Sequence, residues 1–383
     1  MADHRTILIS HPDTGLEEWE SLREPLMTGW LTQGPKVEAF EKAFANKHGV
    51  RFAFATSSCT TALHLILTAL GIGPGDEVIV PAFTWVATAN AVLYCGATPV
   101  FVDVDRTTFN IDGRQIPEKI NPRTKAIIPV HLFGLCADMD TIADGAPGIP
   151  PIEDAACASG SGYKDRSAGS LGTAGAFSFH PRKSITTGEG GMITTNHEGL
   201  AAKINALRNH GASISEEQRH QGLQPYTLPD FNLLGFNYRM TDLQGAVGMV
   251  QLSKLDRYIE ERKRWADYYA QELAELPWLH TPSVPKGYEH SWQAYVCYID
   301  ENKSPMSRNR LMEALYAKGI HTRPGTHAVH MLGLYKERFG IHPDDFPVAR
   351  DCERYTMAIP LHNRMTSEDY EFVVKTIKSL KGK

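Results

Sequence analysis

The sequence has 383 residues, of which 42% are hydrophobic and 22% are charged, and this balance is typical of a folded globular protein and argues against extensive disorder. At about 150 residues per domain, the length allows two domains, or one large domain with a smaller one attached. The formal net charge of −5 at pH 7 creates no overall field that would attract nucleic acid or an anionic membrane, so we expect neither as a partner.

Cysteine usage and the apolar runs indicate the compartment. The six cysteines are scattered, with no C-x-x-C pair and no short Cys/His spacing, which argues against structural zinc and against a disulfide framework. The first residues, MADHRTILISHPDTG, lack the basic segment and apolar core of a signal peptide, and no apolar run approaches the ~20 residues that span a bilayer. We therefore expect a cytoplasmic protein with reduced cysteines.

The first clear element is an amphipathic helix at residues 34–50. Val37, Phe40 and Phe44 stand at helical spacing, between a proline suited to the first turn and a glycine suited to the stop. A short strand is expected next, at residues 51–55.

A polar cluster at the start of the following helix is a candidate anion site. Ser58, Cys59, Thr60 and Thr61 precede an apolar helical run, and the free N–H groups of a helix N-terminus together with hydroxyl side chains can hold a phosphate. The same residues would serve equally well as a simple helix cap. The pattern alone leaves both interpretations open.

Apolar runs then alternate with helical stretches. Strands are expected at residues 77–81, 98–105 and 124–134, with a helix around 84–95, and the weak period-2 alternation indicates an α/β sheet buried on both faces. The glycines of GIGPGD (71–76) follow a helix and precede a strand. This order is the reverse of a dinucleotide-binding fingerprint, so we interpret them as a turn and reject a nicotinamide-linked enzyme.

Candidate ligand contacts stand at or after three strand ends, where sheets of this kind bind ligands. Trp85 comes after the strand at 77–81, and there it can stack on a planar ring or pack in the core. Asp154 ends the apolar run PPIED, and a strand at 174–180 delivers Ser178 to a loop that carries Lys183. A strand at 190–196 is expected to be its hairpin partner.

The remaining chain predicts a helix at 197–209, a segment at 211–233 too irregular to assign, and a helix of roughly thirty residues that begins at a Thr241 or Asp242 cap and links two domains. From about residue 255 the pattern becomes α+β, so the domains are expected at 1–254 and 255–383. The elements expected in the second domain are strands at 290–299 and 319–324 and helices at 305–318, 347–356 and 366–381.

His327 and His330 form an H-x-x-H pair whose spacing could bind a metal. No carboxylate stands nearby in the sequence, so we interpret them as surface or substrate-contact histidines and expect no metal site.

A strand-end carboxylate, a loop lysine, a hydroxyl-lined helix N-terminus and an aromatic side chain together match the needs of pyridoxal 5'-phosphate. The lysine bonds to the aldehyde, the carboxylate keeps the pyridine nitrogen protonated so that the ring accepts electrons, and the helix N-terminus holds the phosphate. The lysine must be partly neutral to react, and we expect desolvation and the neighbouring Arg182 to lower its pKa.

At this point the chain resembles the DegT/DnrJ/EryC1/StrS family, the sugar aminotransferases of pyridoxal-phosphate fold type I. The motifs FSFHPRKSITTGEGG and GFNYRMTDLQ carry the resemblance most specifically, and others support it in the right order over nearly the whole chain. It implies an α/β fold: a large domain with a mostly parallel mixed sheet flanked by helices, and a smaller α+β C-terminal domain.

The resemblance also implies roles for individual residues. Lys183 would bond to the cofactor and act as general acid and base, Asp154 would pair with the pyridine nitrogen, and Trp85 would stack on the ring. The other cofactor contacts would be Ser58, Cys59, Thr60, Cys157, Ser178 and, from the partner subunit of a homodimer with composite active sites, Asn237. The substrate contacts would be Arg239, Arg323 and His327.

Two residues depart from the family's usual pattern. Cys59 precedes Thr60 where Gly-Thr is frequent, and Cys157 stands near the ring hydroxyl, where Gln is frequent. In addition, the segment HTRPGTHAVH is longer than the short Pro-x-His form of nucleotide-sugar aminotransferases.

The sequence thus predicts a pyridoxal-phosphate-dependent aminotransferase that works by a ping-pong mechanism through pyridoxamine phosphate. The donor is an amino acid, with L-glutamate expected, and the acceptor is a keto or aldehydo sugar of surface-polysaccharide or secondary metabolism. A nucleotide-linked keto-sugar, a keto-sugar acid and a cyclitol such as an inosose all stay open as acceptors. A non-catalytic ligand sensor on the same fold is the competing class, and the intact pair of Lys183 and Asp154 disfavours it.

Overall fold

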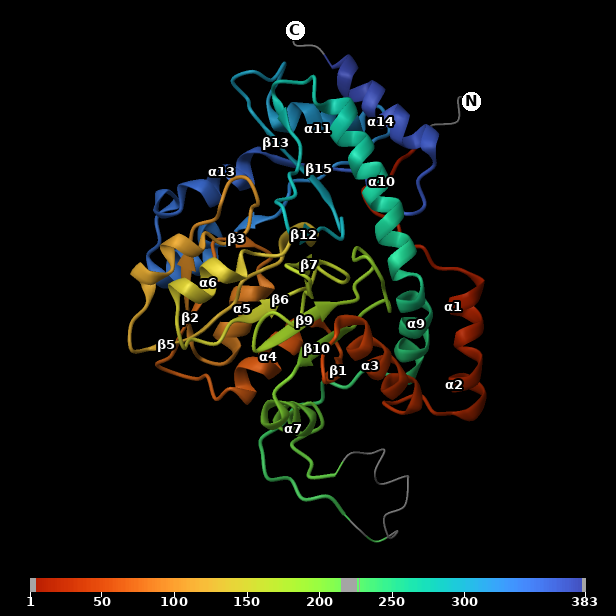
Figure 1. Ribbon diagram of the computed structural model, residues 1–383, viewed down its shortest axis with the longest axis vertical. Helices are drawn as coiled ribbons and strands as arrows, with labels where there is room; N and C mark the ends of the chain where they lie inside the picture. Colours follow the sequence, from red (N-terminus) through yellow and green to blue (C-terminus); the bar gives the residue numbers. More distant parts are fainter. Residues whose placement is uncertain (1–4, 215–225, 227, 381–383) are drawn as a thin grey trace.

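The computed structural model describes residues 5–214, 226 and 228–380, and a central mixed sheet dominates it (Figure 1). A four-stranded and a three-stranded sheet are joined by parallel bridges from Ile127 to Pro151 and from Val130 to Asp154. The strand order is β1 (Phe52–Thr56), β10 (Gly191–Thr195), β9 (Ala174–Ser178), β6 (Ile152–Asp154), β5 (Thr124–Ile127), β2 (Glu77–Pro81), β4 (Thr98–Val102). Within this sheet β10 runs antiparallel to both of its neighbours, and the other pairings are parallel. The predicted mostly parallel mixed sheet and the β9–β10 hairpin are confirmed.

Two predicted strands are too long at their C-terminal ends. The strand expected at 98–105 ends at Val102, where the following Asp103 turns its carboxylate to the N–H groups of Val348 and Ala349. The strand expected at 124–134 ends at Ile127. Pro129 lacks an N–H and interrupts the ladder. Beyond it Val130 makes a single bridge to Asp154, and Phe133 adopts a left-handed φ of 58° that turns the chain away from the sheet.

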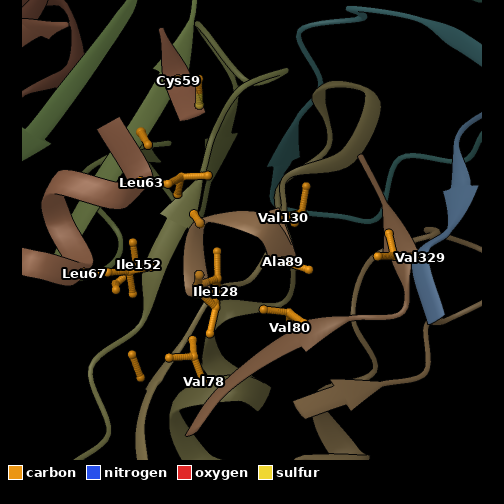
Figure 2. Packing of buried hydrophobic residues seen from close by; sticks show 14 of the residues in the cluster. Cys59, Leu63, Leu67, Val78, Val80, Ala89, Ile128, Val130, Ile152 and Val329 are labelled. Atoms are coloured by element: carbon orange, nitrogen blue, oxygen red, sulfur yellow. The ribbon is translucent and has the colours of Figure 1, made fainter. Parts of the chain in front are cut away.

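The sheet is buried on both faces, as the sequence predicted. Val78 and Val80 of β2 point into one hydrophobic cluster, while Ile79 points into another. Figure 2 shows the first cluster, in which Leu63 and Leu67 pack near Ile152 and Ile128. The second cluster lies on the opposite face, under the predicted helix at 34–50.

The helices around the sheet follow the expected order, with four additions to the predicted helices. The flanking helices are α3 (Pro35–His48), α4 (Cys59–Ala69), α5 (Ala87–Tyr94), α6 (Met139–Gly145) and α7 (Glu198–Leu207). Sequence reasoning missed α6 and also α1 (Leu16–Ser21), α2 (Arg23–Thr28) and α12 (Gly333–Phe339). All four are only six or seven residues long, which is too short for a clear apolar period.

The C-terminal part forms its own antiparallel sheet, β11 (Leu279–His280), β13 (Tyr295–Ile299) and β15 (Thr356–Ile359), and its own hydrophobic cluster. The helices α11 (Arg308–Tyr316), α13 (Pro347–Tyr355) and α14 (Ser367–Ser379) lie close to the predicted ranges. The strand predicted at 290–299 begins only at Tyr295, since Trp292 has a left-handed φ of 53°. The strand predicted at 319–324 is wrong, because this segment makes only single bridges through Ile320 and Arg323.

The long predicted helix is two helices, α9 (Asp242–Ser253) and α10 (Leu255–Leu273), separated at Lys254. Thr241 is the N-cap and accepts a hydrogen bond from the N–H of Gln244. Figure 1 shows α10 rising from the level of the large sheet to α14. Ile7, near the other end of the chain, packs in the C-terminal cluster, and the domain division at 254/255 stays a prediction.

Of the segment left unassigned at 211–233, residues 215–225 and 227 lie outside the described residues. Among the helices that are described, none combines the length and apolar character needed to cross a membrane.

Candidate active site

A cavity of about 310 Å³ lies at the carboxyl ends of the central strands, where α/β sheets bind ligands. Its lining combines residues from the large sheet, such as Asp154 and Ser178, with Arg323 and Ala358 from the C-terminal part. Nine of the predicted site residues line it: Ser58, Cys59, Thr60, Trp85, Asp154, Cys157, Ser178, Lys183 and Arg323. The structure therefore brings together residues that are up to 265 positions apart in the sequence, from Ser58 to Arg323 (323 minus 58).

The Asp154 carboxylate is held at the end of β6 by two hydrogen bonds. Oδ2 accepts from Thr88 Oγ1 at 2.7 Å, and Oδ1 accepts from the Ala156 N–H at 3.2 Å. Burial raises the pKa of Asp154, and these hydrogen bonds and the charge of Lys183 only partly offset that effect. A buried carboxylate facing a cavity is well placed to attract a cationic N–H group of a ligand.

Lys183 reaches the cavity from the loop after β9, and its Nζ lies 3.1 Å from the Cys157 Sγ. Burial alone would lower the pKa of this lysine, but the effects of Cys157, Cys59 and Asp154 outweigh it, so the pKa lies above its ordinary value. The expectation of a pKa lowered by burial and by Arg182 is therefore wrong for this arrangement. The Lys183 amine is held as a hydrogen-bond donor to the thiol.

The N-terminus of α4 opens onto the same cavity. Ser58 Oγ accepts from the Thr61 N–H at 3.1 Å and the Ser58 carbonyl accepts from Ala62 at 3.0 Å, so Ser58 acts as a helix cap. The N–H groups of Cys59 and Thr60 have no acceptor within the helix and can meet an anion. The cluster is thus both a helix cap, through the Ser58 side chain, and a candidate anion site, through the backbone N–H groups of Cys59 and Thr60.

Gly191, at the start of β10, permits this arrangement. A Cβ at this position would lie 2.5 Å from the backbone carbon of Ser58, so a larger residue would push the helix N-terminus out of place. Close packing against Ser58 therefore explains why the last residue of TGEGG is a glycine, and the sequence pattern alone did not indicate this.

Trp85 is 55% exposed, so the alternative of core packing is wrong. The Trp85 ring lies against His327, with ring centroids 5.6 Å apart. His327 itself is exposed and does not line the cavity, although it flanks the tryptophan. An exposed indole at the cavity mouth is available to stack on a ligand ring.

Two predicted contacts lie away from the cavity of their own chain. Asn237 is exposed and forms a bridge with Asn209, whose Oδ1 accepts a 2.7 Å hydrogen bond from Arg239 Nη1.

His330, expected on the surface or at the substrate, is buried, with Nε2 3.2 Å from the Pro343 carbonyl. Across the part of the chain that the structure describes, no cluster of three or more His, Cys, Asp or Glu is arranged to hold a metal.

Sequence reasoning missed several residues that shape the site. Thr88 supports Asp154, and Gln293 Nε2 donates a 2.7 Å hydrogen bond to the Arg182 carbonyl. The spacing of Thr84 and Thr88 by one helical turn was a signal that could have indicated Thr88, since their hydroxyls lie 3.1 Å apart. Nothing in the local sequence linked Gln293 to the lysine loop.

Comparison with known proteins decides the family. The family model for the DegT/DnrJ/EryC1/StrS aminotransferase family matches residues 12–378. The chain belongs to this family. Fold type I and the α/β class are thereby confirmed, and the protein is a pyridoxal-phosphate-dependent aminotransferase.

Three similar proteins show how complete the match is. The spore coat polysaccharide biosynthesis protein SpsC of Bacillus subtilis is 40% identical over 97% of this chain and 96% of its own length. The GDP-perosamine synthase of Caulobacter vibrioides is 42% identical over 98% of this chain and 99% of its own. A putative sugar aminotransferase, Spr1654 from Streptococcus pneumoniae, superimposes in its PMP form with a TM-score of 0.91 at 29% identity, covering 98% of both chains.

The cavity of this aminotransferase fits pyridoxal 5'-phosphate. The cofactor supplies an aldehyde that bonds to an amine and a ring that accepts electrons. Lys183 presents an amine, Asp154 a buried carboxylate for the ring nitrogen, and Trp85 an exposed aromatic face. The free N–H groups at the α4 N-terminus and the Ser178 hydroxyl are donors suited to its phosphate.

Proposed function

We propose that this aminotransferase moves an amino group from L-glutamate to a keto or aldehydo sugar in two half-reactions, passing through the pyridoxamine phosphate form. The single observation that carries the proposal is that Lys183 and Asp154 line one cavity of about 310 Å³. The names of its relatives support a sugar acceptor, because one serves polysaccharide biosynthesis and another is a GDP-perosamine synthase.

Asp154 and Lys183 would have different roles in the reaction. Asp154, whose carboxylate accepts hydrogen bonds from Thr88 and Ala156, would favour a proton on the cofactor's ring nitrogen. Lys183 would hold the cofactor's aldehyde through its amine, and when that Nζ is free it would act as the general acid and base at the substrate carbon. The loop position of Lys183 beside Cys157 keeps this Nζ inside the cavity during the transfer.

We also propose that the protein is a homodimer with composite active sites. Asn237 and Arg239 belong to the specific GFNYRMTDLQ motif, yet neither lines the cavity of its own chain. A second copy that brings its Asn237 to the phosphate and its Arg239 to the substrate gives both residues a role.

The decisive experiment is to record the visible spectrum of the purified protein, then add L-glutamate. We expect a cofactor absorbance band that disappears as 2-oxoglutarate forms in equal amount. Lys183→Ala should lose the lysine-bound band and the conversion, whereas the surface variant Lys125→Ala should retain both. A protein that stays colourless with added pyridoxal phosphate contradicts the proposal, and a coloured protein that no amino acid converts points to the sensor class instead.

A further inference from the structure

Two hydroxyl groups in the cavity wall have no hydrogen-bond partner among residues 5–214, 226 and 228–380. One belongs to Thr326, which is 8% exposed, and the other to the partly buried Ser10. Both residues line the cavity. Hydroxyl groups with so little access to solvent are normally paired, because an unpaired one costs free energy. These two are therefore available to a bound molecule.

The backbone on both sides of Thr326 is fixed. The Gly325 N–H donates to Thr356 Oγ1 at 3.2 Å, and the Val329 N–H donates to the Ala82 carbonyl at 2.8 Å. A Cβ at Gly325 would lie 2.6 Å from Thr356 Oγ1, so a larger residue does not fit there. Thr326 is thus held in place by its own chain before any ligand binds.

Ser10 belongs to the N-terminal strap, residues 7–13, which is fixed at both ends. Its first residue, Ile7, donates its N–H to the Gly319 carbonyl at 2.8 Å, and the carbonyl of its last residue accepts from the Tyr258 hydroxyl at 2.9 Å. The strap therefore joins the C-terminal part to α10. Ser10 lies between these two attachments, where the strap forms part of the cavity wall.

Thr326 also stands next to the aromatic side chain that is expected to stack on the cofactor. The short strands β3 (Phe83–Thr84) and β14 (His327–Ala328) pair in an antiparallel ladder. Trp85 directly follows β3 and Thr326 directly precedes β14, so the register of the ladder continues to these two residues. A molecule held by the Thr326 hydroxyl is thereby kept beside the Trp85 indole.

The two hydroxyl groups are separate from the groups suited to the cofactor. The carboxylate of Asp154 and the N-terminus of α4 belong to the large sheet and its helices, whereas Ser10 and Thr326 come from the strap and from the C-terminal part. Serine and threonine hydroxyl groups donate and accept, as the hydroxyl groups of a sugar do, while an ionised carboxylate only accepts. The pair is therefore matched to the ring hydroxyl groups of a sugar.

We propose that Thr326 and Ser10 form an acceptor subsite that hydrogen-bonds ring hydroxyl groups of the sugar, so that the N-terminal strap takes part in acceptor recognition. This inference rests on the proposed function and names residues that select its acceptor. A ring without hydroxyl groups would cover both side chains and leave them unpaired. The subsite therefore favours a hydroxylated ring over an apolar ring of the same size.

The subsite is tested with ring amines that resemble the expected product, titrated into the cofactor-loaded protein and followed by the visible cofactor band. The hydroxylated probes are D-glucosamine, kanosamine and viosamine, which carry the amine on the second, third and fourth ring carbon. Cyclohexylamine is the probe without hydroxyl groups. We expect the best amino sugar to bind at least about tenfold more tightly than cyclohexylamine, as for two neutral hydrogen bonds.

Thr326→Val and Ser10→Ala should each lower this preference at least about threefold, because each removes one hydroxyl group and little volume. Thr326→Ser keeps the hydroxyl and should retain the preference. The control is Thr107→Val, on an exposed loop outside this cavity, which should leave the preference unchanged.

Three results would overturn the subsite. The first is equal binding of cyclohexylamine and all three amino sugars by the unaltered protein, and the second is a preference that survives both substitutions. The third is a Thr326→Val variant that keeps the preference but loses affinity for pyridoxal 5'-phosphate or changes its oligomeric state, since the hydroxyl would then contact the cofactor or a second subunit.

Conversion of L-glutamate by the unaltered protein is measured in parallel, so that the two proposals fail separately. If L-glutamate is not converted but the amino-sugar preference depends on both hydroxyl groups, the proposed function fails while the subsite stands. If L-glutamate is converted and the preference is absent, the subsite fails while the proposed function stands.

Discussion

Thr88 Oγ1 donates a 2.7 Å hydrogen bond to Oδ2 of Asp154, and this bond ties α5 to the end of β6 inside the core. Thr88 is fully buried and Asp154 is 5% exposed. A carboxylate this deeply buried tends to take up a proton, and burial does raise the pKa of Asp154. The threonine hydroxyl counteracts this tendency and keeps the carboxylate available for a cationic ring.

Thr88→Val should therefore weaken catalysis without removing any group that touches the substrate. Loss of the hydrogen bond raises the pKa of Asp154 further, so its hold on the ring-nitrogen proton weakens. Because a hydrogen bond to a charged group is worth about 1.5–3 kcal/mol, we expect the rate of cofactor conversion by L-glutamate to fall about 10- to 100-fold. Thr84→Val is the matched control, since its hydroxyl contacts Thr88 but not Asp154; an equal loss in that variant would contradict a direct role for the hydroxyl of Thr88.

The composite site is tested by subunit mixing. Lys183→Ala and Asn237→Ala should each be nearly inactive as pure proteins, the first through the lost amine and the second through a lost phosphate contact. In a mixed dimer, one of the two cavities would combine an intact Lys183 with an intact partner Asn237. We expect activity to return on refolding the two variants together, up to about a quarter of the unaltered level for random pairing of two subunits. No recovery, in a sample shown by mass spectrometry to contain mixed dimers, would place Asn237 and Lys183 in the same chain's site.

Much of this fold was predictable because its strands are short apolar runs separated by turn residues. The order of the elements around Asp154 and Lys183 followed from the sequence, and the carboxyl-end rule placed Trp85 at the ligand site. Strand ends were less predictable, since they depend on long-range contacts: Asp103 leaves the sheet because residues 348 and 349 offer it N–H groups.

The site was predictable where one residue carries the chemistry and unpredictable where tertiary contacts set its environment. Lys183 and Asp154 stood out in the sequence, but the raised pKa of Lys183 depends on Cys157, 26 positions away, and on Cys59. Likewise, Arg323 lines the same cavity as Lys183 only because the C-terminal part covers it. Charge partners of this kind cannot be read from local spacing.

A stability prediction concerns Asp242, which was considered as a cap for its own helix but instead caps another. Its Oδ1 accepts from the N–H groups of Gly34 at 2.8 Å and Val37 at 3.0 Å, and its Oδ2 accepts from Lys36 at 3.1 Å. The side chain is 1% exposed. Asp242→Asn keeps the size but loses the charge and one acceptor, so it leaves a buried N–H unpaired.

We expect Asp242→Asn to lower the free energy of unfolding by about 1–3 kcal/mol, measured by urea denaturation. Asp256→Asn is the control, because among the described residues that carboxylate forms one exposed ion pair, with Lys47, and such pairs contribute about 0–1 kcal/mol. If the two variants are equally stable, the cap on α3 does not stabilise the fold.

The pH dependence of stability should be set on the acid side by three buried histidines. Burial lowers the pKa of His48 to about 4, that of His290 to about 3 and that of His362 to about 4, against an ordinary value of 6.5. The unfolded chain therefore binds more protons than the folded one between about pH 6.5 and pH 4. Stability is fully present above pH 6.5 and falls as the pH drops through that window.

Each of these histidines contributes at most about 1.4 kcal/mol per pH unit once its unfolded form is protonated, so urea midpoints should fall steeply between pH 6.5 and pH 5. His48→Phe offers a specific check, since the His48 ring stacks on Phe44 with centroids 4.3 Å apart and a phenyl ring preserves that packing. The variant loses the Nδ1 contact to the Ala168 carbonyl at 2.9 Å and therefore some stability at pH 7.5. The pH dependence of its free energy of unfolding should be weaker, by the contribution of one histidine. The control is His197→Gln, at an exposed position, which should keep the full pH dependence of the free energy of unfolding. If His48→Phe shows the same pH dependence as the unaltered protein, His48 is protonated as readily in the folded state as in the unfolded state.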